Sequence, residues 1–177
     1  MGGETGGRQT HELRSGPASG SRSHNYRLLF AIREGIFVEP GIAAGPDRFL
    51  AGGIGITPIR SICRWLTDTG SKADARVLYS ARTPDDFVFL DDFKEMTERN
   101  PQLSLVLTLT DEDPPGGWDC RAGRICSEMV REETPDYRDR TFFICAPPRM
   151  VEGMVGMLKD DLALPAAQII SEDFKGY

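Results

Sequence analysis

The stretch Arg48-Phe-Leu-Ala-Gly-Gly-Ile-Gly-Ile-Thr-Pro-Ile-Arg-Ser-Ile62 decides the fold of this chain. Its apolar start, from Phe49 to Ala51, predicts a buried strand. The strand then runs into three glycines, Gly52, Gly53 and Gly55. Glycine permits positive φ and lets a ligand approach bare backbone, while Thr57 suits a helix N-cap and Pro58 the first helical position. A strand, a glycine turn and a capped helix would together aim free backbone N–H groups at a phosphate or another electron-rich group.

The spacing of this turn is Gly53-x-Gly55-x-x-Pro58, which differs from the G-x-G-x-x-G fingerprint of many dinucleotide-binding folds. On spacing alone, two interpretations stay open. The turn either binds a ligand, or it is a tight strand-to-helix connection that binds nothing.

The bulk composition narrows the class of protein. A chain of 177 residues is long enough for one good core, or for one domain plus an appendage. Its composition, 40% hydrophobic and 27% charged, is typical of a soluble globular protein. No apolar run is long enough to span a membrane, so we expect a cytoplasmic protein. The net charge of −6 argues against a nucleic-acid partner. Four cysteines occur without a C-x-x-C pair, which predicts free thiols and no metal site.

Strands and helices alternate after the glycine turn. Beyond the first strand, we expect strands at 76–81, 103–109, 141–145 and 168–171, and helices at 58–70, 85–99, 123–133 and 151–162. This alternation predicts an α/β fold with a doubly wound, five-stranded parallel sheet. Residues 1–27 are rich in Gly, Ser, Arg and Thr and should be irregular or disordered. Residues 28–47 should form a connecting strand and loop.

Ligands of open α/β sheets bind outside the carboxyl ends of the strands. Those ends are predicted at 52–57, 80–82, 108–111, 145–148 and 171–174, and they hold small, polar or reactive residues. Each residue also has a plainer interpretation. Arg82 could be a solvated surface residue, Trp118 could pack within its loop, and Cys145 could be a small hydrophobe.

Several of these segments resemble one known family. Ala51-Gly-Gly-Ile-Gly-Ile-Thr-Pro58 resembles the first nicotinamide-binding turn of the ferredoxin–NADP reductase superfamily, whose members pair a flavin-binding β-barrel with a nucleotide-binding α/β lobe. Cys145-Ala-Pro-Pro-Arg-Met150 resembles its Cys-Gly-Pro-x-x-Met motif, with Ala146 in place of glycine. Glu172-Asp-Phe174 resembles its Glu-x-aromatic ending. The order of motifs over 49–174 is similar to the phthalate dioxygenase reductase branch.

The resemblance implies roles for individual residues. Thr57, Cys145 and Glu172 would surround the nicotinamide and serve hydride transfer. Cofactor contacts are implied for Gly52, Gly53, Gly55, Ile56, Thr57, Pro58, Ser80, Arg82, Thr110, Asp111, Cys145, Ala146, Pro147, Met150 and Phe174. Trp118 and the Gly123-Arg-Ile125 segment would support the pyrophosphate and ribose. The methyl group of Ala146 would weaken nucleotide binding or shift the nicotinamide ring.

Residues 48–177 would therefore be an NAD(P)H-binding lobe that passes hydride to FAD or FMN. Electrons would continue to an iron–sulfur or heme partner. No Lys or Arg occurs between Arg82 and Lys94, while Asp85 and Asp86 would repel a phosphate, which favours NADH over NADPH.

The flavin half of such a reductase is represented by little of this sequence. Only Gly20–His24 and Arg33–Phe37 resemble parts of a flavin lobe, so residues 1–27 are either disordered or a remnant of it. We expect the flavin lobe or subunit to come largely from elsewhere. A non-catalytic nucleotide-binding or regulatory module is the alternative function.

Overall fold

A six-stranded, all-parallel sheet lies at the centre of the computed structural model, which describes residues 47–173. The strands lie side by side in the order β4-β3-β2-β1-β5-β6. Their bounds are β1 Asp47–Gly52, β2 Ala75–Ala81, β3 Leu103–Leu109, β4 Cys120–Ala122, β5 Thr141–Ala146 and β6 Ile169–Asp173. The order places β1 in the middle, with β2 on one side and β5 on the other.

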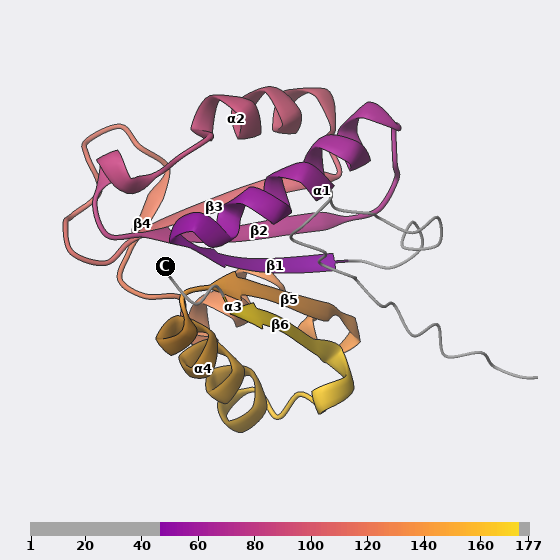
Figure 1. The fold of residues 1–177 in the computed structure, drawn as a ribbon, viewed down its shortest axis with the longest axis vertical. Coiled ribbons are helices and arrows are strands. Elements are labelled where there is room, and N and C mark those ends of the chain that lie inside the picture. Colours follow the sequence, from indigo (N-terminus) through magenta and orange to yellow (C-terminus); the bar gives the residue numbers. More distant parts are fainter. Residues whose placement is uncertain (1–46, 174–177) are drawn as a thin grey trace, which may run out of the picture.

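Helices cover both faces of the sheet (Figure 1). Helices α1 (Ile56–Asp68) and α2 (Leu90–Arg99) lie on one face. Helices α3 (Ser127–Glu133) and α4 (Pro148–Gly156) lie on the other, and a π-helical turn, Met157–Asp161, continues α4. The predicted α/β architecture with helices on both faces is therefore confirmed.

Two hydrophobic cores follow from this layering. Successive side chains of a strand point to opposite faces, so Phe49 packs with the core under α1 and α2, while Leu50 packs with the core under α3 and α4. Both side chains are almost fully buried. Burial on both faces explains why the central strands are continuous apolar runs rather than alternating ones.

The prediction of five strands was wrong, because the sheet has a sixth strand, β4, at its edge. It contains only three residues, Cys-Arg-Ala, and pairs with the end of β3 alone. So short a segment carries no hydrophobic pattern of its own. Pairing with β3 makes it a strand.

Three predicted helices begin at other residues than expected. Helix α2 begins at Leu90 rather than at residue 85, because Pro84–Asp86 forms a separate 3₁₀ turn and Phe89 has a φ of 62°. Phe87 suggested helical periodicity, but it is buried by an edge-on contact with Tyr79. Helix α3 begins four residues later than predicted, and α4 three residues earlier.

The N-terminus of α1 also differs from the prediction. A 3₁₀ turn, Gly53–Gly55, leads into the helix, which begins at Ile56 with Gly55 as its N-cap. No side chain caps this end. The prediction of Thr57 as the N-cap was wrong, because the glycine turn continues directly into helical backbone and leaves Thr57 exposed inside the first turn.

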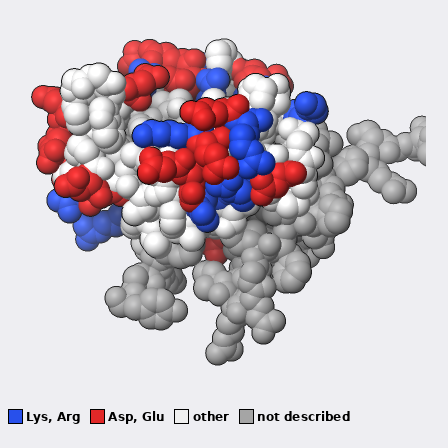
Figure 2. Space-filling model, turned by 90° about the horizontal axis from the view of Figure 1, so that it is seen from above, with Lys and Arg blue, Asp and Glu red and all other residues white. Residues whose placement is uncertain are grey.

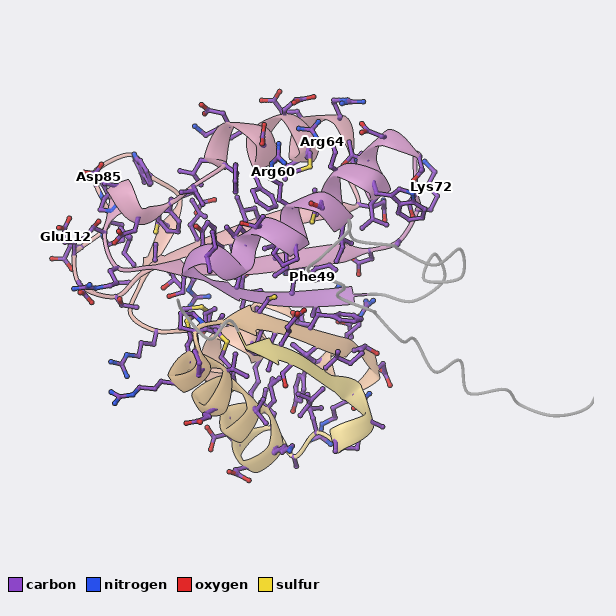
Figure 3. All side chains as sticks on the ribbon, in the orientation of Figure 1. Phe49, Arg60, Arg64, Lys72, Asp85 and Glu112 are labelled. Carbon is purple, nitrogen blue, oxygen red and sulfur yellow. The ribbon has the colours of Figure 1, made fainter. Side chains whose placement is uncertain are left out.

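Ion pairs join the outer surfaces of α1 and α2. Arg60 pairs with Asp92, and Arg64 donates to both carboxylate oxygens of Glu95 at 3.1 Å. Figure 3 shows both arginines between the two helices, and Figure 2 shows interleaved acidic and basic residues over this face. Exposed pairs of this kind contribute about 0–1 kcal/mol each. They keep this face polar.

A second set of charges holds the amino ends of the central strands. The buried Arg48, in β1, pairs at 2.9 Å with Asp74, which precedes β2. Arg140, just before β5, pairs with the same carboxylate at 2.9 Å. This cluster lies at the opposite end of the strands from the glycine turn.

Among residues 47–173, no helix is long and apolar enough to cross a membrane.

One glycine of the turn is fixed by packing. A Cβ at Gly55 would lie 1.9 Å from the backbone oxygen of Cys145 and 2.8 Å from the nitrogen of Ala146. We therefore expect Gly55→Ala to lower the free energy of unfolding by at least about 2 kcal/mol, since α1 would have to move away from β5. Urea denaturation measures this difference.

Gly116→Ala is the matched control, because a Cβ at Gly116 meets nothing within 4 Å. It should change stability by less than about 0.5 kcal/mol. Equal stability of the two variants would contradict the packing argument.

Candidate functional site

The glycine turn lies where the strand order reverses. The chain leaves β1 toward β2 and later returns to β5 on the other side, so the carboxyl ends of β1 and β5 flank a crevice. Gly53 has a φ of 52°, which favours glycine. A Cβ at Gly52 would lie 2.2 Å from the sulfur of Met150, so the first turn of α4 packs closely on the glycine turn.

A cavity of about 850 Å³ opens beside this turn at the carboxyl edge of the sheet. Its volume falls within the range of small-molecule and cofactor sites. In Figure 3, Asp85 and Glu112, which follow β2 and β3, mark this edge, and Lys72 lies at the opposite edge. Six residues proposed from the sequence line the cavity: Gly53, Ser80, Arg82, Thr110, Pro147 and Met150.

The cavity also has lining residues that were not among the proposed site residues. They are Ile54, Ala81, Asp86, Val88, Arg124, Ile125, Arg149, Gly153 and Met154. Arg124 and Ile125 belong to a segment already singled out by its resemblance, and Arg149 lies inside a quoted motif. Gly153 and Met154 follow Met150 by three and four residues, so helical periodicity in α4 brings them to the same wall.

The residues proposed for the nicotinamide form a second group outside this lining. Cys145 in β5 pairs in register with Glu172 in β6 and with Ala51 in β1. Thr57 is exposed in the first turn of α1, two residues after Gly55, which packs on the Cys145 carbonyl. The sequence-predicted site is thus divided between the cavity and the ends of β5 and β6.

Cys145 is almost fully buried, with 1% of its surface exposed. Burial, and then the negative charge of Glu172, raises the pKa of the Cys145 thiol to about 12. The thiol is therefore neutral near pH 7, and a nucleophilic thiolate is not available.

Ala146 is not among the residues that line the cavity. Ala146 is fully buried in the core under α3 and α4, together with Leu50 and Ile144. Gly55 and Ile56 are also buried, as is Pro58. The expected effect of Ala146 on nucleotide binding stays a prediction.

An ion pair joins the ends of β2 and β3. The Arg82 Nε donates to the Asp111 Oδ2 at 2.9 Å, and the Thr110 hydroxyl donates to the Asp111 Oδ1 at 2.9 Å. The Arg82 guanidinium, and then the Thr110 hydroxyl, hold the pKa of the Asp111 carboxyl below its usual value. The cavity rim near β2 therefore carries a paired arginine rather than an isolated one.

The structure also gives the environment of Trp118 and of the cysteines. Trp118 packs against Phe87, with ring centroids 6.4 Å apart, and remains 41% exposed. All four cysteines are free thiols, as predicted. Within residues 47–173, no three metal-ligating side chains cluster. Phe174, residues 1–46 and their flavin-like segments lie outside the described residues.

A parallel sheet wound on both faces, a glycine turn at its switch point and a cavity at the same edge define a dinucleotide-binding type of α/β domain.

Comparison with known proteins identifies the family. Residues 49–155 match the family described as oxidoreductase NAD-binding domain, and the chain belongs to that family. This confirms the resemblance to ferredoxin reductases.

Individual relatives are longer proteins. The chain is 32% identical over 113 residues to the glycine betaine monooxygenase reductase subunit of Chromohalobacter salexigens, covering 63% of this chain and 31% of that protein. It is 31% identical over 140 residues to the NADH oxidoreductase HCR of Escherichia coli, covering 73% and 40%. The crystal structure of an Amycolatopsis cytochrome P450 reductase aligns with a TM-score of 0.64 at 28% identity, covering 73% and 38%. The chain thus spans less than half the length of these proteins.

The burial of the thiols predicts their reactivity. Cys126 is exposed and Cys120 half-buried, whereas Cys63 and Cys145 are buried. We expect iodoacetamide at pH 8 to alkylate Cys126 first, and Cys145 only on unfolding, because its raised pKa keeps the thiol protonated. Mass spectrometry of the labelled peptides measures the order. Labelling of Cys145 at the rate of Cys126 would contradict both its burial and its raised pKa.

Proposed function

We propose that this chain is the NAD(P)H-binding lobe of a flavin-dependent electron-transfer reductase. The dinucleotide lies across the carboxyl edge, with its adenosine half in the cavity and its nicotinamide toward Thr57, Cys145 and Glu172. The observation that carries this proposal is the packing of Gly55 on the Cys145 backbone, beside a cavity that both Gly53 and Pro147 line. It joins the glycine turn and the cysteine motif into one site.

The adenosine half is supported by the chemistry of the cavity. The N-terminus of α1 has no side-chain cap, so its backbone N–H groups and positive helix end remain available to a pyrophosphate. Apolar walls from Ile125 and Met154 suit an adenine ring, and Ser80 and Thr110 supply hydroxyl groups for a ribose.

The nicotinamide half is supported by the pairing of Cys145 with Glu172. When bound, NAD(P)H supplies a hydride from its nicotinamide ring to the flavin. The neutral Cys145 thiol packs against the ring and fixes its position, while Glu172 at the next strand end and Thr57 offer polar contacts. Holding the reacting atoms about 3–3.5 Å apart is the main contribution of such residues.

The names of relatives suggest the electron acceptor. They include a monooxygenase reductase subunit and a cytochrome P450 reductase. The flavin, FAD or FMN, would be bound by a flavin lobe or subunit, and electrons would pass to an iron–sulfur or heme partner. Phe174 would cover the flavin face that the nicotinamide must reach.

Two measurements on the full chain test this function. Calorimetric titration with NADH and with NADPH detects binding, and reduction of ferricyanide by the chain with added FAD or FMN detects electron transfer. We expect saturable binding of a dinucleotide and flavin-dependent reduction. Binding without reduction under any flavin condition would favour a non-catalytic nucleotide-binding module. A chain that binds neither dinucleotide would refute the proposal.

The role of Cys145 has its own test. We expect Cys145→Ser to slow hydride transfer to flavin about tenfold or more, because a shorter, more polar side chain would misplace the ring. The Kd for NADH should change by less than about threefold, since the adenosine half carries most of the contacts. Cys63→Ser, at a buried cysteine of α1 that is not among the proposed site residues, is the control and should leave the rate unchanged. Stopped-flow rates that are equal in wild type and Cys145→Ser would rule out this role.

A further inference from the structure

Two arginines at the cavity differ from all others in the described part of the chain. Every arginine of residues 47–173 except Arg124 and Arg149 has a hydrogen-bond or ion-pair partner there. Arg124 follows β4, Arg149 lies in the first turn of α4, and both line the cavity. Neither guanidinium group makes a hydrogen bond or an ion pair within residues 47–173, although the charge of Arg124 contributes to lowering the pKa of Asp111, and both arginines line the same cavity.

Beside β2 and β3, the cavity carries one arginine, Arg82, and two nearby acids, Asp86 and Asp111. Arg82 follows β2 and is paired with Asp111, while Asp86 accepts hydrogen bonds at 3.0 Å from the Thr83 nitrogen and hydroxyl. The positive charge of Arg82 is therefore already paired with the carboxylate of Asp111.

Asp111 is held in place from several sides. Its backbone N–H donates to the Arg82 carbonyl at 3.1 Å, and each carboxylate oxygen accepts a hydrogen bond, one from Arg82 and one from Thr110. Its lowered pKa keeps the carboxylate charged at neutral pH. These three hydrogen bonds define the pair at the rim, where the Arg82 side chain is 79% and the Asp111 side chain 44% exposed.

We propose that this division of charge selects NADH: Arg124 and Arg149 take the pyrophosphate, and Asp111, by engaging Arg82, excludes a phosphate on the ribose 2′ oxygen. In dinucleotide-binding α/β folds, residues at the end of the second strand meet this ribose. An acid there accepts from the 2′ hydroxyl, and an arginine accommodates a 2′-phosphate. Here the arginine is present but engaged by an acid.

The physical argument is a balance of charges. A 2′-phosphate would bring about two negative charges to the rim beside Asp111, where Arg82 is already paired and Arg124, whose charge also lowers the pKa of Asp111, is taken by the pyrophosphate. A 2′ hydroxyl brings no charge and can donate to the same carboxylate. The pyrophosphate, which NADH and NADPH share, does not distinguish the two cofactors.

The inference rests on the proposed function, and its test uses the adenosine half alone. Adenosine 5′-diphosphate and adenosine 2′,5′-bisphosphate are titrated calorimetrically into the full chain and into Asp111→Asn. We expect the wild type to prefer the 5′-diphosphate. Asp111→Asn should bind the 2′,5′-bisphosphate about tenfold more tightly, because one charge-assisted hydrogen bond from Arg82 is released. Affinity for the 5′-diphosphate should fall several-fold, because its 2′ hydroxyl loses a charged acceptor at residue 111.

Two further variants separate local from general effects. Asp113→Asn removes the same charge from an exposed residue that has no ion pair in the described part of the chain, and it should change neither affinity. Arg149→Gln should weaken the 5′-diphosphate several-fold, since that ligand carries the shared phosphates. Arg82→Gln added to Asp111→Asn should abolish the gain.

The outcomes distinguish the two proposals. Suppose that the wild type binds both adenosine phosphates tightly and that Asp111→Asn changes neither affinity. This result would overturn the selection of NADH and leave the proposed function standing. An equal gain in Asp113→Asn would show a general charge effect and would also overturn it. Failure of the wild type to bind either adenosine phosphate, NADH or NADPH would refute the proposed function and this inference together.

Discussion

The close approach of Gly55 to the Cys145 carbonyl is the constraint on which the rest of the site depends. No side chain fits between α1 and the end of β5 there, because a Cβ would lie 1.9 Å from the carbonyl oxygen. This contact joins the start of the first helix to a strand about ninety residues later in the chain. It brings an uncapped helix N-terminus beside a buried, neutral thiol, and it sets one border of the cavity.

The parallel sheet determines where charges can lie. Both of its faces are covered, so polar and charged groups collect at the two ends of the strands. At the amino ends, Arg48 and Arg140 share Asp74 and hold the strands together. At the carboxyl ends, Arg124 and Arg149 make no hydrogen bond or ion pair with residues 47–173, and both line a cavity. The paired charges at the amino ends stabilise the fold, whereas the two arginines at the carboxyl ends can bind an anionic ligand.

Much of the fold was predictable because local patterns encode it. The alternation of Leu and Val with Ser and Thr over 103–109 predicted a strand with correct bounds, and the glycines followed by Thr57-Pro58 predicted the turn and helix. Two of the errors share one cause. β4 is a strand only because it pairs with β3, and Phe87 is buried by Tyr79 rather than by a helix. Such tertiary contacts leave no local pattern, so strand number and helix ends were misjudged.

The sequence by itself determined the family, the glycine turn and six residues of the cavity lining, since these depend on motifs and on strand ends that a parallel sheet gathers at one edge. Only the tertiary structure decided which charges remain available. Arg82 is neutralised by a residue 29 positions away, whereas Arg124 and Arg149 meet at the cavity without partners in the described chain. Electrostatic pairing depends on distance in space rather than on separation in sequence. The glycine turn could therefore be predicted from the sequence, whereas the charge of its site could not.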